Sequence, residues 1–168
     1  IESQKITLNQ QPGDLIQYIG DIFSLFELYA NKKGIETEVN SEIEYFYTKF
    51  DHDVIEKLFT NLFSNAIKYT FDDGYVGVKI NKATQEEIVG LELPTKSQTE
   101  YVSIAITNTG AEIPEDKKEE IFESFNHLTL NQPRFEESTG LGLAIVKELV
   151  NSLEGKITLH SGDSKVTF

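Results

Sequence analysis

Two asparagines and a lysine share one edge of a segment whose other residues form the apolar face of a helix. The segment, residues 60–70, reads TNLFSNAIKYT and carries Asn61, Asn65 and Lys68. At about 100° per residue these side chains fall within about 60° of one another. Asparagine is a mediocre helix former, so the two together cost roughly 1 kcal/mol relative to alanine. Amide oxygens ligate Mg²⁺ and an ammonium meets phosphate, which favours an ion or polyphosphate site; a solvated helix face is the alternative.

A glycine-rich turn forms the second candidate site. Residues 139–144 read TGLGLA, so that Gly140 and Gly142 precede and open a helix. Backbone N–H groups at a helix N-terminus attract anions, and phosphate is the usual one. Close packing or a cap explains such glycines equally well. The turn has neither the spacing of a dinucleotide-binding fold nor the lysine of a P-loop.

A polar turn at the end of an apolar strand forms the third candidate. Residues 101–107, YVSIAIT, alternate as a strand does, and residues 108–114, NTGAEIP, follow at once. An ordinary strand-to-helix turn has a similar composition. The order of segments is more informative: the asparagine-bearing helix, this strand and turn, IFESF at residues 121–125, a loop, and then TGLGLA.

The elements that must position these residues follow from periodicity and caps. Asp14 and Asp51 are N-cap residues ahead of two amphipathic segments, the first of which ends at Gly34. A third helix is expected over residues 141–153, and a short acidic one from Pro114 to residue 125. Extended segments are expected at residues 35–39, 43–50, 75–80, 88–93, 101–107, 156–160 and 165–168. Because helices and strands are segregated, we expect an α+β fold, a two-layer α/β sandwich with the helices on one face of a mixed, mostly antiparallel sheet.

Composition limits the class of protein. The chain has 168 residues, of which 39% are hydrophobic, which is ordinary for a single domain covering residues 1–168. It has no cysteine, so a disulfide framework is impossible and the cytoplasm is the default location. A net charge of -13 argues against nucleic-acid binding. No apolar run is long enough for a membrane span, so no direct membrane contact is expected. The chain begins at Ile1, and we expect it to be excised from a longer protein.

Taken together, the three candidate sites resemble the conserved boxes of a known family. Residues 61–69 resemble the N box, 108–114 the G1 box, 121–125 the F box and 139–144 the G2 box of the catalytic ATP-binding domain of bacterial sensor histidine kinases. This is a branch of the GHKL superfamily, with a Bergerat-type fold, that also contains DNA gyrase. Residues 126–138 correspond to the ATP lid. The sequence GDLIQYI at residues 13–19 is similar to hybrid two-component sensors of the Bacteroides group.

The resemblance implies roles for individual residues. Asn65 would ligate the Mg²⁺ that bridges the ATP phosphates, Asn61 would support the same region, and Lys68 would meet phosphate. Asn61 and Lys68 are thus the expected catalytic residues. The remaining expected nucleotide contacts are Tyr69, Asn108, Gly110, Ile113, Thr139, Gly140, Leu141, Gly142 and Leu143.

The resemblance also implies a reaction. ATP-hydrolysing relatives have a glutamate that activates water at the position of Asn61, and an amide has no useful basicity. Slow hydrolysis is therefore expected, with the γ-phosphoryl of Mg·ATP passing to a histidine on the protein's own dimerisation domain and then to a response-regulator receiver domain. Surface or structural roles explain His52, His127 and His160, so the isolated fragment should not phosphorylate itself on histidine. The parent would be a membrane-bound sensor with this domain in the cytoplasm.

Three departures from the family pattern leave alternatives open. Asn108 replaces an aspartate that accepts a hydrogen bond from the adenine amino group, which should weaken ATP binding by about 1 to 2 kcal/mol. Glu112 replaces a glycine and would add about 1 kcal/mol of strain if its φ were positive. Ser124 and His127 replace phosphate-facing groups, which leaves Arg134 as the cation of the lid. One alternative is a pseudokinase that acts through protein contacts; another is a relative that phosphorylates protein serines.

Overall fold

A five-stranded sheet forms one layer of the protein. The computed structural model describes residues 7–95, 99–123 and 140–168. The strands lie in the order β2 (Glu36–Ser41), β4 (Tyr75–Lys82), β5 (Val102–Thr109), β7 (Lys165–Thr167) and β6 (His160–Gly162). The pair β2 and β4 is parallel, and the other neighbours are antiparallel. The expected mixed, mostly antiparallel sheet is therefore confirmed.

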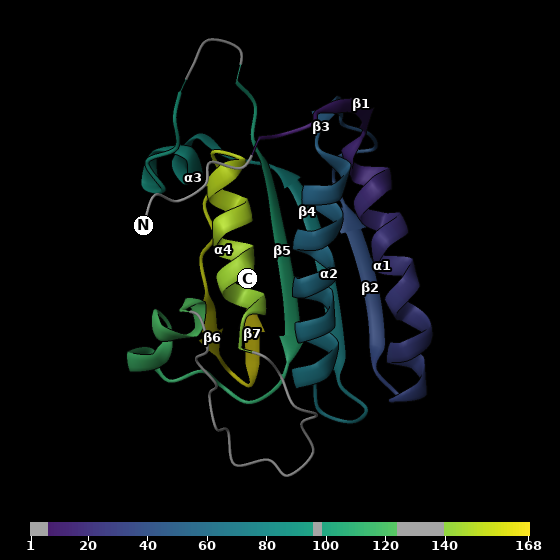
Figure 1. Ribbon diagram of the computed structural model, residues 1–168. Coiled ribbons are helices and arrows are strands. Elements are labelled where there is room, and N and C mark those ends of the chain that lie inside the picture. The colour runs from purple at the N-terminus through teal and green to yellow at the C-terminus, as the bar shows by residue number, and fades with distance from the viewer. Residues whose placement is uncertain (1–6, 96–98, 124–139) are drawn as a thin grey trace.

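Three helices form the second layer. Figure 1 shows α1 (Leu15–Lys32), α2 (His52–Tyr69) and α4 (Gly142–Ser152) side by side over one face of the sheet. The central helix, α2, packs against both of the others. The two-layer α/β sandwich predicted from the sequence is confirmed. Among the described helices, none is long and apolar enough to cross a membrane.

Aspartate caps begin both long helices where the sequence predicted. The Asp14 carboxylate accepts hydrogen bonds from the backbone N–H groups of Ile16 and Gln17. The Asp51 carboxylate accepts from Val54 N at 3.1 Å and also from Asn9 N at 2.6 Å. These N–H donors, that of Asn9 first, hold the pKa of the buried Asp51 carboxyl below its ordinary value of 3.8. Asp51 therefore joins the chain that precedes β1 (Gln11–Asp14) to the start of α2. The strand β1 itself pairs with β3 (Tyr47–Phe50) as a separate antiparallel ribbon.

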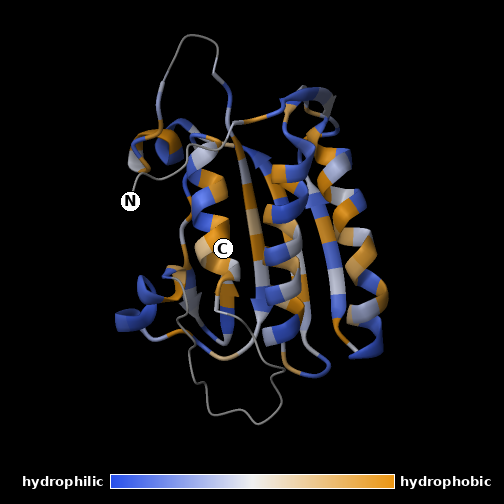
Figure 2. Cartoon of the chain, viewed as in Figure 1, coloured by the Kyte–Doolittle hydropathy of each residue, from blue (hydrophilic) through white to orange (hydrophobic). Residues whose placement is uncertain are grey.

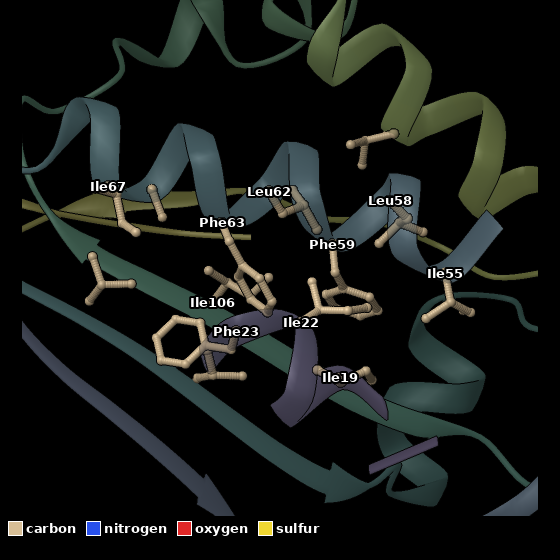
Figure 3. Packing of buried hydrophobic residues seen from close by; sticks show 14 of the residues in the cluster. Ile19, Ile22, Phe23, Ile55, Leu58, Phe59, Leu62, Phe63, Ile67 and Ile106 are labelled. Atoms are coloured by element: carbon tan, nitrogen blue, oxygen red, sulfur yellow. The ribbon is translucent and has the colours of Figure 1, made fainter. Parts of the chain in front are cut away.

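The hydrophobic core lies between the helices and the sheet. Figure 3 shows side chains of α1, α2 and β5 pointing toward one another, with Phe23, Phe63 and Ile106 among them. The rings of Phe23 and Phe63 meet edge to face, with centroids 4.9 Å apart. Along β5 hydrophobic and hydrophilic residues alternate, as Figure 2 shows, because only one face of the sheet is covered by helices. This core fixes α2 against the strand whose end carries the third candidate site.

The structure corrects three of the predicted elements. Residues 88–93 do not form a strand, because α3 (Gln85–Gly90) is a helix that Thr84 and Glu87 begin with a capping box. The acidic helix after Pro114 is instead a pair of short 3₁₀ turns, η1 (Glu115–Lys117) and η2 (Glu120–Phe122). The predicted strand at residues 156–160 is displaced, since β6 covers His160–Gly162. All three errors fall on short segments that bury few apolar residues.

Candidate nucleotide-binding site

The polar stripe of α2 lies at the edge of the core and is half-buried. Asn61, Asn65 and Lys68 are each partly exposed, while the apolar residues between them are buried. The Asn61 side chain is held in one orientation, because its Nδ2 donates to the backbone oxygen of Lys57 at 2.7 Å. Its Oδ1 is directed toward the first residue of α4. The stripe is therefore neither core nor freely solvated surface.

The glycine turn comes into contact with this stripe. A Cβ atom placed on Gly142 would lie 3.0 Å from Asn61 Oδ1 and 3.7 Å from Asn65 Nδ2. Gly140 has a φ of +65°, a conformation that favours glycine. Leu141, at the N-cap of α4, has no side-chain oxygen to bond the first N–H groups of that helix. The start of α4 thus presents N–H donors beside two amides, which suits an anion.

The turn after β5 lies against the last residues of α2. A Cβ on Gly110 would be 2.5 Å from the backbone oxygen of Tyr69, and Gly110 forms a β-bridge with Thr70. Only glycine permits this approach. Lys68 Nζ lies 5.7 Å from the centroid of the Tyr69 ring, so both side chains belong to the same end of the helix. In Figure 1 the end of α2 and the arrowhead of β5 lie at the same edge of the molecule.

Asn108 is the most deeply buried polar residue of the candidate site. Its side chain is 3% exposed, and within the described part of the chain its Nδ2 has no hydrogen-bond partner. It lies two residues after Ile106 in β5, so its side chain points to the same face of the sheet, the one covered by helices. A buried amide donor without a partner costs about 1 to 3 kcal/mol, which indicates a position that a ligand completes.

The expected strain at Glu112 is not found. Glu112 has no positive φ, since the described non-glycine residues with positive φ are Asp73, Glu92, Glu154, Asp163 and Ser164. The Glu112 carboxylate instead accepts a hydrogen bond from Ser164 N at 2.8 Å. Gly110 N donates to Ser164 O at 3.0 Å, so both backbone groups of Ser164 are bonded to the turn after β5. The departure from the family pattern is thus a structural contact.

Sequence reasoning missed the residues that support this turn. Ile113 N donates to the hydroxyl of Ser161 at 2.7 Å, so Ile113 is oriented by β6. Ser161 lies in β6 and Ser164 in the turn that leads to β7, where the sequence alone indicated only two extended segments. Nothing in the local composition shows which other segment a hairpin will contact, because that depends on strand order.

Some predicted site residues lie outside the described part of the chain. These are Thr139, the last two residues of the F box, the whole lid at 126–138, and with them Ser124, His127 and Arg134. Leu143 is described and is partly buried against the core. Within the described residues there is no group of three or more His, Cys, Asp or Glu side chains that could hold a metal ion. A metal at the described residues would therefore depend on amide oxygens, water and the ligand's own oxygens, a donor set that fits Mg²⁺.

Comparison with known proteins identifies the family. Residues 50–168 match the model of the histidine kinase-, DNA gyrase B- and HSP90-like ATPases. One relative, the hybrid signal transduction histidine kinase D of Dictyostelium discoideum, is 32% identical over 161 residues, which are 96% of this chain and 10% of that protein. The chain spans 10–16% of the length of four similar curated relatives, all named as histidine kinases.

Solved structures agree in fold. The catalytic domain of the histidine kinase ThkA has a TM-score of 0.76 at 24% identity, covering 96% of this chain and 93% of that one. ThkA in complex with the response regulator protein TrrA has a TM-score of 0.69 at 23% identity, covering 95% of this chain and 40% of that one. The chain therefore belongs to the histidine kinase-, DNA gyrase B- and HSP90-like ATPase family, as a catalytic ATP-binding domain of the sensor histidine kinase type.

Proposed function

We propose that this chain binds Mg·ATP between α2, the start of α4 and the end of β5, and serves a longer kinase that transfers the γ-phosphoryl to a histidine. The observation that carries the proposal is the contact between Gly142 and the asparagines: an added Cβ would lie 3.0 Å from Asn61 Oδ1. This contact places the N–H groups of one helix beside the amides of another, which a polyphosphate with a cation can use.

Each residue of the site has a distinct part in this proposal. The Asn65 amide oxygen ligates Mg²⁺, which supplies charge neutralisation at the phosphates when bound. Lys68 adds a positive charge at the end of α2, and the first N–H groups of α4 bind phosphate oxygens. Asn61 donates to Lys57 O, and this bond holds its carbonyl oxygen toward Gly142, at the start of α4. Asn61 thereby helps to position the phosphates there.

The chemistry of Asn61 favours transfer over hydrolysis. Hydrolysis needs a group that accepts a proton from water, and an amide cannot do so. A histidine acceptor is its own nucleophile, so positioning and charge neutralisation are sufficient. The chain is much shorter than its relatives, so the acceptor histidine is proposed to lie on a dimerisation domain of the parent protein. The ThkA–TrrA complex supports a receiver domain as the next partner. A cytoplasmic position in a membrane-bound sensor is part of the same proposal.

Titration calorimetry with Mg·ATP and Mg·ADP tests the binding step. The wild-type chain should bind both, and Asn65→Ala should lose the dependence of affinity on magnesium while it melts at a similar temperature. Ser64→Ala, an exposed neighbour on the same helix, is the matched control and should bind as the wild type does. Loss of binding in the Ser64 variant would show that the helix, and not the amide, was responsible.

A phosphate-release assay tests the reaction class. We expect the chain alone to release phosphate from Mg·ATP far more slowly than a dedicated ATPase, because Asn61 cannot act as a base. Rapid release would contradict the transferase proposal.

The uncharged amide of Asn108, where the family pattern has an aspartate, favours a second candidate, a pseudokinase that binds nucleotide poorly. Absence of binding in both the wild type and Asn108→Asp would support this candidate instead.

A further inference from the structure

Two of the site's amides, those of Asn61 and Asn108, differ in what holds them. Asn61 Nδ2 donates to Lys57 O at 2.7 Å, which fixes the direction of its carbonyl oxygen. Asn108 Nδ2 is buried and has no acceptor among the described residues, and its side chain is 3% exposed. The oxygen and nitrogen ends of an amide are nearly equal in size. No hydrogen bond in the described structure therefore selects which end of the Asn108 amide faces a ligand.

The strand neighbours of Asn108 impose no direction on its amide. Its neighbours across the sheet are Val76 of β4 and Val166 of β7, which supply no side-chain donor or acceptor. A Cβ on Gly110 would lie 3.0 Å from Asn108 Nδ2, so the glycine keeps the space beside the amide open. None of these contacts includes a carboxylate or another charged group that would fix the direction of the amide.

Purine bases differ in the hydrogen-bonding groups that they would present to the Asn108 amide. A 6-aminopurine presents a donor at position 6 and an acceptor at N1, and a 6-oxopurine presents the reverse. A carboxylate only accepts hydrogen bonds, so it selects the 6-amino base and repels the 6-oxo oxygen. An amide carries both a donor and an acceptor, and a rotation of about 180° exchanges them.

We infer that Asn108 makes the site permissive for the purine base, so that it accepts 6-oxopurine nucleoside triphosphates as well as ATP. This inference rests on the proposed function, because it assumes that a nucleotide base reaches Asn108. With ATP the Oδ1 end accepts from the 6-amino group and the Nδ2 end donates to N1. With a 6-oxo base the Nδ2 end donates to the oxygen. In both cases the buried amide gains a partner that the protein does not provide.

Calorimetric titration of Mg·ATP, Mg·ITP and Mg·GTP tests the inference. ITP differs from ATP only in its 6-oxo base with N1–H, whereas GTP adds a 2-amino group whose fit is a separate matter. The wild-type dissociation constants for ATP and ITP should agree within about tenfold. Asn108→Asp should tighten ATP and weaken ITP, changing their ratio by at least about a hundredfold. The control is Asn81→Asp, which makes the same chemical change on β4. Asn81 pairs with Ser103, near the opposite end of the β4–β5 ladder from Asn108, so this variant should leave the ratio unchanged.

The outcomes separate the two proposals. ATP binding to the wild type with ITP bound more than a hundredfold more weakly would overturn the inference and leave the proposed function standing. No binding of any nucleotide to the wild type or to Asn108→Asp would overturn both. The ratio of the wild-type dissociation constants for ATP and ITP tests the inference even if Asn108→Asp fails to fold. In addition, the side-chain amide resonances of Asn108 should shift in different directions with ATP and ITP, and an identical shift would also count against the inference.

Discussion

The two sides of α2 differ, because one packs into the core and the other carries the proposed nucleotide site. On one side, side chains such as Phe59, Phe63 and Ile67 are almost fully buried against α1 and the sheet. On the other, Asn61 and Asn65 are half-buried beside Gly142. The apolar side offsets the loss of helix propensity that the asparagines cause, since burying one large apolar side chain contributes roughly 1.5 to 3 kcal/mol. A helix can therefore carry unfavourable residues where its other face is well packed.

The largest expected effect is on the apolar side. Phe63 is fully buried and contacts the rings of Phe23, Phe26 and Phe59. Phe63→Ala should lower the free energy of unfolding by about 3 to 5 kcal/mol, because it removes apolar contacts and leaves a cavity. Urea unfolding followed by circular dichroism measures this loss. The exposed Ser64→Ala should stay within about 0.5 kcal/mol of the wild type. Equal losses in the two variants would show that the two sides of α2 are not distinct in stability.

The next effect concerns the start of the same helix. Asp51 caps α2 through Val54 N and holds the preceding chain through Asn9 N. Asp51→Ala should cost about 2 kcal/mol near neutral pH, since a cap contributes about 1 kcal/mol and a hydrogen bond to a carboxylate somewhat more. Asp51→Asn keeps an acceptor and should lose less. Urea unfolding of both variants checks the order, and an equal loss would contradict a role for the carboxylate charge.

The loss at Asp51 should depend on pH in a defined direction. Hydrogen bonds from Asn9 and Val54 lower the pKa of the folded carboxyl below its ordinary value of 3.8. The carboxylate therefore stabilises the fold fully above that value and loses this contribution as pH falls through the folded pKa. The gap between wild type and Asp51→Ala should be constant from about pH 5 to about pH 7 and should shrink below about pH 3.8. A gap that widens in acid would exclude this linkage.

Sequence reasoning succeeded where burial or a cap decides structure. Both long helices begin at the predicted aspartates, because an N-cap is a local interaction. The stripe of α2 was visible because helical spacing alone brings its residues together. The partner of Glu112 was not, because its bond to Ser164 joins residues 52 positions apart through the strand order of the sheet. The helix α3 was mistaken for a strand, because a six-residue segment offers too few apolar positions to reveal its period.

A smaller effect is expected where the polar side of α2 meets α4. In Gly142→Ala the new Cβ would lie 3.0 Å from Asn61 Oδ1, and this amide is held by Lys57, so the helices must shift by a few tenths of an ångström. Alanine favours a helix, so stability should hold or rise slightly while Mg·ATP affinity falls about tenfold, roughly 1.4 kcal/mol. Gly20→Ala in α1, where an added Cβ meets nothing within 4 Å, is the control. It should gain about 0.5 to 1 kcal/mol in stability and keep its affinity. If calorimetry gave equal affinities for the two variants, the Gly142 contact would have no part in the site.

The smallest effect is expected at Glu112, which supports the turn after β5 from outside the proposed nucleotide site. The Glu112 carboxylate accepts from Ser164 N at an exposed position, so Glu112→Ala should cost only about 0.5 to 1 kcal/mol. Amide hydrogen exchange should reveal the change locally. The Ser164 amide should exchange its hydrogen faster, while the Gly110 amide, which donates to Ser164 O, should be affected less. Glu112→Gln keeps an acceptor oxygen and should keep the protection of Ser164. Unchanged exchange at Ser164 in the alanine variant would mean that the Glu112 carboxylate does not protect this amide, and that Gly110, Ile113 and the pairing of β5 with β7 hold the hairpin without it.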